Sequence, residues 1–334
     1  MAGTGTAHLR DDDADVVLRI QDLVVEYPTA HAGTVHAVSN ISLDIRRGET
    51  LGLVGESGCG KSTLAKAIMQ LPPPTSGQVL FHGDDLTTKS VRGLRSARRP
   101  IQMIFQDPIS SLNPLRKVRH IVAEGLEVAG GHSKVQRAEL VDTMLESVGL
   151  DPDAAGDRKP HEFSGGQCQR ISIARAMVLE PEVVICDEPV SALDVSVQAQ
   201  ILNLLEDMKD RHDLTLLFIA HDLAVVKNIS DRVVVMYLGK ICEVAAPDSL
   251  YTRPAHPYTA ALLSAVPEPD PEVEPNTSTL SGDLPSPLDP PSGCRFRTRC
   301  PRATALCAEA EPQIRELRPQ HYVACHFPND AGEP

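Results

Sequence analysis

The 334-residue sequence lacks tryptophan, has only 3% aromatic residues, and carries 45 acidic against 32 basic side chains, a net charge of −13. Proteins that bind nucleic acid usually present a basic face, so this balance argues against a nucleic-acid partner. It also disfavours direct docking on an anionic membrane surface. The apolar runs are short, such as Leu214–Ala220, whereas a membrane-spanning helix needs about 20 apolar residues. We therefore expect no direct membrane span.

The first residues also lack the basic and apolar segments of a signal peptide. We therefore expect a cytosolic chain whose eight cysteines are mostly thiols or metal ligands rather than disulfides. The acidic run Asp11–Asp13 predicts a solvated, disordered leader over residues 1–15.

Proline content divides the chain near Ala246. Residues 1–246 contain 11 of the 27 prolines, and the shorter remainder contains 16 of them together with four of the eight cysteines. The first part reads as an α/β domain, because apolar strand patterns alternate with helical ones and favour a parallel-containing sheet covered on both faces. The remainder reads as a helix, a proline-rich linker and a small cysteine-rich module.

The periodicity predicts individual elements in the first part. The expected strands cover residues 18–27, 37–45, 50–54, 101–105, 183–186 and 214–220. The expected helices cover residues 61–71, 133–148, 167–179 and 195–209. A hairpin is expected around Leu238-Gly239.

A glycine-rich segment between a predicted strand and a predicted helix has the pattern G-x-x-x-x-G-K-[ST]. It consists of Gly55, Glu56, Ser57, Gly58, Cys59, Gly60, Lys61, Ser62 and Thr63. Glycines let consecutive backbone N–H groups surround phosphate oxygens, and the helix N-terminus adds its positive dipole end. Lys61 can then reach the β- and γ-phosphates, and Ser62 can ligate Mg²⁺. The same surroundings should favour the thiolate of Cys59.

Two further motifs point to phosphate chemistry. The apolar strand at residues 183–186 ends in Asp187 and Glu188, which suits a carboxylate that holds Mg²⁺ followed by one that orients or deprotonates a water. Taken alone, the two acids could equally be a solvated strand end. The turn Ser164, Gly165, Gly166 and Gln167 opens a predicted helix and offers a second anion site. Its simpler interpretation is a helix capped by Ser164.

Together these motifs resemble those of the ATP-binding-cassette (ABC) transporter ATPases. Gly55–Thr63 is similar to their Walker A motif, Val183–Glu188 to Walker B, and Ser164–Gln167 to the signature, with Phe163 where leucine is commoner. The remaining matches are Tyr27 with the adenine-stacking aromatic, Gln106 with the Q-loop, Ser191–Asp194 with the D-loop and His221 with the switch histidine. The resemblance implies a RecA-like core, an antiparallel β subdomain and a helical subdomain.

The resemblance also implies a mechanism. Two cassettes pair head to tail around two ATP molecules. Lys61, Ser62, Gln106, Asp187, Glu188 and His221 act on one ATP, and Ser164 and Gly166 close the partner's. Opening and closing of this pair drives membrane subunits that contact the region near Gln106.

Longer stretches are similar to the ATPase subunits of bacterial oligopeptide and dipeptide importers. They are His161–Arg170, Pro189–Ser196, His256–Thr259, Pro285–Pro287 and Gly293–Pro301. Ser264–Pro271 looks most like the second, F-type, ATPase subunit. The resemblance implies two membrane permease subunits, a second related ATPase, an extracytoplasmic peptide-binding protein and a peripheral place on the cytoplasmic face of the membrane. Some relatives handle nickel or glutathione, so the solute stays open.

Four thiols, Cys294, Cys300, Cys307 and Cys325, lie in a small segment that lacks an obvious apolar core, which suggests a bound metal that holds the module together. Cysteine-only ligation suits zinc or an iron–sulfur cluster, and the paired C-x2-C spacing of a zinc ribbon is absent. The resemblance implies a [4Fe-4S] cluster, since related importer ATPases carry one at such cysteines. We thus expect an ABC domain over residues 16–250 and the importer C-terminal region with its cysteine module over 251–334.

Three other classes of protein fit less well. A phosphate-loop GTPase or kinase has no use for the Ser164–Gln167 turn. A DNA-repair or chromosome-structure ATPase would insert a coiled coil or zinc modules between Lys61 and Ser164. A soluble translation factor of the ABC type usually has two cassettes in one chain, and this chain has one.

Overall fold

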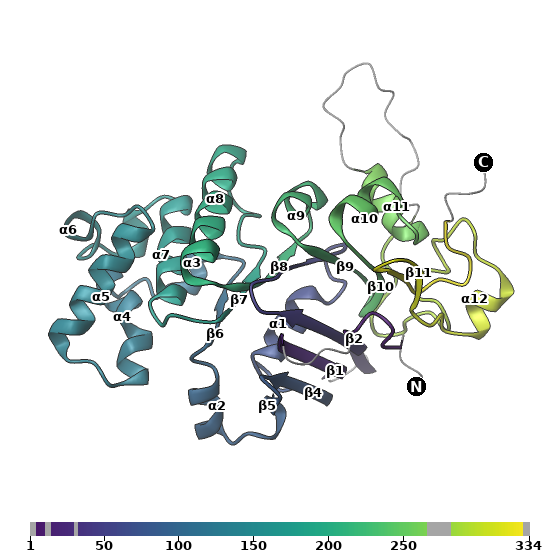
Figure 1. Cartoon of the computed structure of the whole chain (residues 1–334), viewed down its shortest axis with the longest axis horizontal. Helices are drawn as coiled ribbons and strands as arrows, with labels where there is room; N and C mark the ends of the chain where they lie inside the picture. Colours follow the sequence, from purple (N-terminus) through teal and green to yellow (C-terminus); the bar gives the residue numbers. More distant parts are fainter. Residues whose placement is uncertain (1–4, 11–14, 30–32, 266–281, 330–334) are drawn as a thin grey trace, which may run out of the picture. The chain divides into compact units, whose positions relative to one another are not determined.

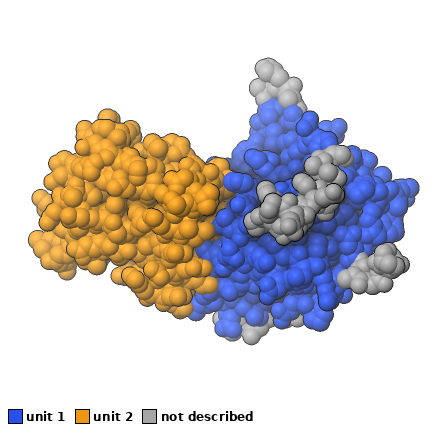
Figure 2. Space-filling view, turned by 90° about the horizontal axis from the view of Figure 1, so that it is seen from above, with its two compact units in different colours: residues 1–88, 220–334 blue, residues 89–219 orange. Residues whose placement is uncertain are grey.

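The computed structural model describes residues 5–10, 15–29, 33–265 and 282–329, which form two compact units. Unit 1 combines residues 1–88 with 220–334, and unit 2 holds residues 89–219 (Figure 2). Asp11–Asp13, most of Ser264–Pro271 and the core of the expected proline-rich linker lie outside the described residues. No helix within the described ranges is both long and apolar enough to cross a membrane.

Unit 1 contains a small antiparallel sheet in the order β2-β1-β4-β5 (Figure 1). Its strands are β1 (Val16–Thr29), β2 (Gly33–Arg46), β4 (Ser76–Phe81) and β5 (Asp84–Asp85), followed by the short 3-10 helix η1 (Leu86–Thr88). The long β1–β2 pair presents an apolar face that includes Leu18, Ile20 and Ile45, all fully buried. This sheet matches the antiparallel subdomain that the resemblance implied.

A second set of strands in unit 1 has the order β11-β12-β10-β9-β3. They are β3 (Thr50–Val54), β9 (Arg232–Tyr237), β10 (Lys240–Ala245), β11 (Arg315–Arg318) and β12 (His321–Val323). Strand β3 runs parallel to β9, and the other neighbours are antiparallel. The β9–β10 hairpin turns at Leu238 and Gly239, both with positive φ, as a tight two-residue turn requires.

The β11–β12 hairpin from the C-terminal region therefore extends the same strand set as the strand that leads into the glycine loop. The helices of unit 1 are α1 (Lys61–Ile68), α9 (Leu223–Ile229), α10 (Pro247–Thr252), α11 (Pro257–Ser264) and α12 (Ala305–Glu309). The start of α11 follows from its sequence, because the His256 side chain accepts a hydrogen bond from the Tyr258 amide and Pro257 occupies the first helical position.

Unit 2 pairs three parallel strands in the order β8-β7-β6. They are β6 (Ile101–Ile104), β7 (Val183–Asp187) and β8 (Thr215–Ala220), and β7 and β8 are buried along their whole length. The helices are α2 (Val91–Ala97), α3 (Pro108–Ser111), α4 (Val118–Ala129), α5 (Lys134–Ser147), α6 (Pro152–Ala155), η2 (Pro160–Glu162), α7 (Gly165–Met177) and α8 (Val195–His212). Helix α7 contacts α3, α4 and α5, which makes a helical region within this unit (Figure 1).

The predicted elements are confirmed, with small shifts at their ends. The strand expected at 50–54 is β3, and the helix expected at 133–148 is α5, which begins with a capping box between Ser133 and Gln136. The prediction did not include α4, whose first turn has no side-chain cap and whose interior contains Gly125. It also did not include the β11–β12 hairpin.

The described part of the expected leader packs on unit 1. His8 is buried, and its Nε2 lies 2.7 Å from the Ser42 carbonyl oxygen. The guanidinium of Arg10 contacts Asp44 at 3.1 Å and Glu49 at 2.6 Å. Residues 5–10 are therefore held by contacts with β2 and the turn that follows it.

Candidate functional site

The glycine loop lies between β3 and α1 and fits its surroundings only with glycine at two positions. A Cβ atom on Gly55 would lie 2.1 Å from the Met236 carbonyl oxygen. Gly60 has a φ of 107°, and a Cβ there would lie 2.2 Å from the Ala37 carbonyl oxygen. Any side chain at these positions would displace the backbone, so the loop depends on both glycines for its shape.

Lys61 lies inside the loop. It is 4% exposed, and its Nζ donates hydrogen bonds to the carbonyl oxygens of Gly55 at 2.7 Å and Glu56 at 3.1 Å. Ser62 and Thr63 follow as half-buried residues in the first turn of α1. The ammonium group is therefore surrounded by the loop that the sequence predicts to cradle phosphates.

The expectation of a reactive thiolate at Cys59 is wrong. The residue is 1% exposed, and burial raises the pKa of its thiol even though the nearby ammonium of Lys61 favours the thiolate. The Cys59 sulfur lies 4.0 Å from the Lys61 Nζ. Cys59 is thus a small, buried side chain of the loop, and alkylating reagents should have poor access to its thiol.

Residues from the C-terminal part of the chain hold the second residue of the loop. The Glu56 amide donates to the Tyr258 hydroxyl at 2.9 Å, and the Glu56 carboxylate accepts from Arg299 at 2.6 Å and 3.1 Å. The sequence motifs included Tyr258 and Arg299 but indicated no function for either. Nothing in the sequence pattern relates two residues so far from the loop to Glu56.

Two other residues that the sequence predicts to bind ATP, Tyr27 and His221, also lie in unit 1. Tyr27 lies half-buried on β1, opposite Val35 of β2. His221 directly follows β8 and is exposed.

In unit 2 the structure brings Gln106 and Glu188 together. The Gln106 Nε2 donates to the Glu188 Oε2 at 2.9 Å. Glu188 directly follows β7 with a φ of 46°, and its amide donates to the Ile219 carbonyl of β8. The neighbouring Asp187 is the last residue of β7 and is 2% exposed. The two acids therefore sit at the carboxyl end of parallel strands, where open α/β sheets bind their ligands.

The predicted signature turn is the start of α7. Ser164 caps the helix, since its Oγ accepts from the Gln167 amide, and Gln167 returns a contact to the Ser164 amide. A Cβ on Gly166 would lie 2.6 Å from the Val197 side chain, and one on Gly165 would lie 3.5 Å from Leu193. The simple capping interpretation is thus confirmed, and the turn also packs against the segment around Asp194.

Asp194 caps α8. Its carboxylate accepts from the Val197 amide at 3.0 Å and from the Ser196 hydroxyl at 2.8 Å, and these hydrogen bonds lower its pKa. The capped start of α8 and the capped start of α7 therefore meet within unit 2.

The four C-terminal cysteines line one small cavity of unit 1. Cys294, Cys300, Cys307 and Cys325 share its walls with His256, Phe296, Arg302 and His326, among others. Burial raises the pKa of Cys294 to about 12 and that of Cys325 to about 11. The backbone amides of Phe296 and Phe327 act in the opposite direction and favour the thiolates of Cys294 and Cys325, but burial has the larger effect on both pKa values.

All eight cysteines are free thiols. Within the described residues, no three or more His, Cys, Asp or Glu side chains form a group that could hold a metal ion. The cysteine-rich module expected around a metal is therefore seen only as four thiols that face a common cavity.

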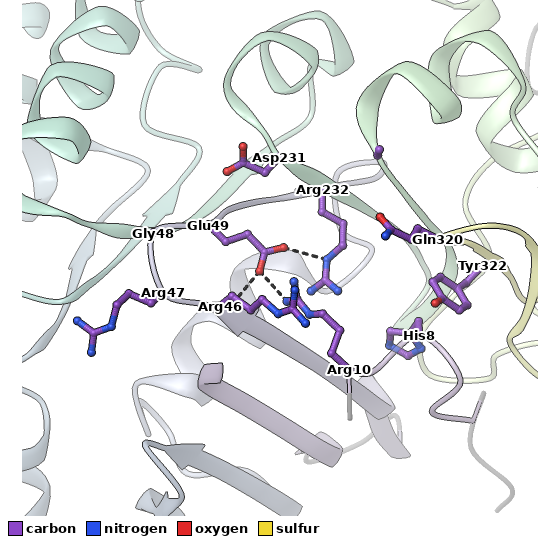
Figure 3. Close-up of a pocket in the computed structure, with 11 residues that line it drawn as sticks. His8, Arg10, Arg46, Arg47, Gly48, Glu49, Asp231, Arg232, Gln320 and Tyr322 are labelled. Atoms are coloured by element: carbon purple, nitrogen blue, oxygen red, sulfur yellow. Dashed lines mark hydrogen bonds and ion pairs between the residues drawn. The ribbon is translucent and has the colours of Figure 1, made fainter. Parts of the chain in front are cut away.

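A cavity of about 530 Å³ lies at the other end of β3 from the glycine loop (Figure 3). Arg10 and Arg232 each contact Glu49, at 2.6 Å and 3.0 Å, and each contacts Asp44. These charges neutralise one another, so we interpret the arrangement as an ion-pair network that joins the leader to β2 and β9. The lining residues are His8, Arg10, Arg46, Arg47, Gly48, Glu49, Asp231, Arg232, Ala246, Gln320 and Tyr322.

Comparison with known proteins gives a consistent set of relatives. The ABC transporter family pattern matches residues 38–191, and the pattern of the oligopeptide/dipeptide transporter C-terminal region matches residues 242–307. The chain is 50% identical over 322 residues to the oligopeptide transport ATP-binding protein AppF of Bacillus subtilis. This alignment covers 94% of this chain and 98% of AppF. It is 53% identical over 295 residues to the oligopeptide transport ATP-binding protein OppF of Haemophilus influenzae, covering 87% and 89% of the two chains.

Two solved structures are similar in fold. One is cbiO1 of Clostridium perfringens, part of the ABC transporter complex cbiONQ, with a TM-score of 0.62 and 31% identity over 71% of this chain and 91% of that one. The other is a dimeric bacterial ABC transporter cassette, MJ0796, with a TM-score of 0.63 and 27% identity over 69% of this chain and 98% of that one.

Proposed function

Because the chain belongs to the ABC transporter family, as an ATP-binding subunit of its oligopeptide and dipeptide importers, we propose that its two units divide the work of ATP hydrolysis. The chain is an ATPase coupled to peptide import, and its fold is that of an ABC cassette. The hydrogen bond between Gln106 and Glu188 carries the assignment of individual residues, because it joins two predicted catalytic side chains.

Unit 1 binds the nucleotide. The loop Gly55–Thr63 directs its backbone N–H groups to the phosphates, and Lys61, already inside the loop, binds the β- and γ-phosphates. Tyr27 stacks on adenine. Ser62, together with Asp187 and Gln106 of unit 2, would hold Mg²⁺, and the ion would supply positive charge to the phosphate oxygens.

Glu188 acts as the general base. It takes a proton from the attacking water while the water oxygen bonds to the γ-phosphorus and the bond to the bridging oxygen of ADP breaks. Gln106 orients the Glu188 carboxylate through the 2.9 Å hydrogen bond. His221 contacts the γ-phosphate from unit 1.

The start of α7 contacts the phosphates of the ATP that the partner cassette binds. Ser164, Gly165, Gly166 and Gln167 open a thirteen-residue helix, and a helix N-terminus favours phosphate. Asp194 holds the neighbouring segment through its cap of α8. Two cassettes that pair head to tail would complete each ATP site with the other's turn.

Substitution of Glu188 by glutamine tests the base assignment. ATP turnover should fall by about 10²- to 10⁴-fold, the usual contribution of a general base, while ATP binding is retained. The exposed Glu206 of α8 provides a matched control, since Glu206→Gln should leave turnover unchanged. Turnover that survives in Glu188→Gln would remove Glu188 from the mechanism.

The cysteines that line the small cavity are proposed to hold a [4Fe-4S] cluster that stabilises the C-terminal region. Four cysteine thiols are the usual ligand set of such clusters, and all four of these cysteines line the same cavity. Iron and acid-labile sulfide analysis of anaerobically purified protein should find about four of each per chain. Zinc without iron or sulfide would replace this proposal with a zinc site.

The full importer is proposed to contain two membrane permease subunits, a second related ATPase and an extracytoplasmic peptide-binding protein. The chain then lies at the cytoplasmic face of the membrane, with residues 16–250 as the cassette, 251–334 as the importer-specific region and 1–15 as a leader. Peptides are the proposed solutes, since the relatives AppF and OppF are oligopeptide transport proteins. Affinity purification from detergent extracts should recover permeases and the second ATPase; recovery of ribosomes or DNA instead would refute the assembly.

A further inference from the structure

The loop between Cys294 and Cys300 presents two different faces. Its cysteines line the small cavity, whereas Arg295 and Arg299 bind residues of the cassette. Phe296 between them is buried among aromatic rings, with its ring centroid 5.2 Å from Tyr237 and 5.4 Å from Tyr258. The loop is therefore a short bridge from the cysteines to the nucleotide-binding part of unit 1.

Arg299 reaches the phosphate-binding loop itself. Its two terminal nitrogens donate to the two carboxylate oxygens of Glu56, at 2.6 Å and 3.1 Å. Such a bidentate pair fixes both position and orientation, and it is stronger than a neutral hydrogen bond. The Arg299 side chain is 5% exposed and the Glu56 side chain 25%, so water screens the pair only in part.

Arg299 is itself held firmly. Its guanidinium lies over the Tyr237 ring at 5.9 Å, and its Nη1 is 3.5 Å from the Tyr237 hydroxyl. Arg295 steadies the other end of the same loop, where it donates to the Ser39 hydroxyl at 2.8 Å and to the Leu238 carbonyl. A side chain held in this way can fix the position of the glycine-loop residue that it binds.

Glu56 is the second residue of that loop, and its amide is also fixed, by the Tyr258 hydroxyl at 2.9 Å. The N–H groups that follow must point at phosphate oxygens, and small displacements of such groups weaken binding strongly. We propose that Arg299 is a positioning residue of the ATP site: through Glu56 it sets the shape of the phosphate-binding loop. The Cys294–Cys300 loop is then a working part of nucleotide binding as well as part of the C-terminal region.

The test uses the full chain in its importer complex, with ATP affinity measured by fluorescent ATP-analogue binding and KM and kcat by steady-state hydrolysis. Arg299→Gln should raise Kd and KM roughly tenfold, the loss expected for a charged hydrogen-bonded pair, with kcat at saturating ATP little changed. Glu56→Ala should do the same from the loop side, without touching the C-terminal region. The double variant should bind ATP no more weakly than either single variant, because both substitutions remove the same contact.

Arg297→Gln is the matched control. Arg297 lies in the same loop, but its guanidinium donates to the carbonyl and hydroxyl oxygens of Ser292 rather than to Glu56. The KM of this variant should therefore equal that of the unchanged protein. Unchanged KM in Arg299→Gln would overturn the proposal, and so would effects of the two single changes that multiply in the double variant. A loss of kcat without a change in KM would also contradict it, because that pattern reports damage to hydrolysis rather than to nucleotide binding.

Discussion

The phosphate-binding loop of unit 1 and the helix starts at Ser164 and Asp194 of unit 2 are held in place by contacts of different range. Glu56 of the loop is fixed by Tyr258 and Arg299, which are 202 and 243 residues away in the sequence. In unit 2, Ser164 and Asp194 are fixed by amides three residues on. The phosphate-binding loop is therefore held by the C-terminal region, whereas Ser164 and Asp194 are held mainly within their own helix starts.

The largest expected effect comes from removal of the aromatic side chain that anchors the long-range contacts. Phe296→Ala should lower the free energy of unfolding by about 3–5 kcal/mol, since it leaves a cavity among Tyr237, Tyr258 and His256. Denaturant titration followed by circular dichroism suits a chain without tryptophan. Leu306→Ala on α12 is the control, because Leu306 is 44% exposed and should cost little. Equal costs for the two variants would mean that Phe296 is not an anchor.

In unit 2 the corresponding change is Gln106→Ala, which removes the hydrogen bond to Glu188. We expect kcat to fall by about 10- to 100-fold with KM nearly unchanged, because a misoriented base slows proton transfer while Ser62 and Asp187 remain as the proposed ligands of Mg²⁺. Gln102→Ala on β6, the strand that precedes Gln106, provides the control, since the Gln102 side chain donates to the carbonyl oxygens of Arg98 and Arg99. An effect of Gln106→Ala on KM alone would contradict the proposal that unit 1 binds the nucleotide and unit 2 orients the catalytic base.

A smaller effect is expected at the local caps. Ser164→Ala and Ser133→Ala both remove a capping-box serine, so each should cost about 1 kcal/mol of stability. Only Ser164→Ala should also lower ATPase activity, because only its helix start is proposed to bind the partner's ATP. Thermal unfolding and steady-state hydrolysis measured on both variants separate the two contributions. Equal ATPase activity in the two variants would contradict the assignment of α7.

The smallest effect concerns the leader. Burial, with the charge of Arg232, lowers the pKa of His8 below its ordinary value of 6.5, although the Ser42 carbonyl and Asp44 favour the proton. The undocked leader binds the proton more readily, so docking is most stable above about pH 6.5 and weakens as the pH falls below it. Hydrogen exchange of the amides of residues 5–10, corrected for its intrinsic rate, should show this loss of protection. His8→Gln should remove the pH dependence; a dependence that persists would assign it to another group.

The same difference in range explains what the sequence could predict. β3 and α5 were predicted closely, because the strand has a compact apolar pattern and Ser133 begins α5 with a recognisable cap. The Walker, Q-loop and signature residues were predicted from ordered local motifs. Gln106 and Glu188 were named separately, and only the fold places them 2.9 Å apart.

Long-range contacts left no such signal. In the sequence, Arg299 is one of several arginines in a cysteine-rich region. Its partner, Glu56, lies 243 residues away in the glycine loop, so no local motif indicates the contact. The β11–β12 hairpin has few apolar residues, and it is held by backbone pairing to β10 and by buried His321, which contacts the buried Glu243 at 2.6 Å. Cys59 was misjudged because the sequence shows the helix start beside it but not the packing that buries it.

The most direct test of the division of work compares Arg299→Gln with Gln106→Ala in one steady-state ATPase experiment on the importer complex. The account predicts that Arg299→Gln raises KM roughly tenfold at nearly constant kcat, and that Gln106→Ala lowers kcat at nearly constant KM. If both variants change the same parameter, loop positioning by the C-terminal region and base orientation in unit 2 are not separate functions, and the account is wrong.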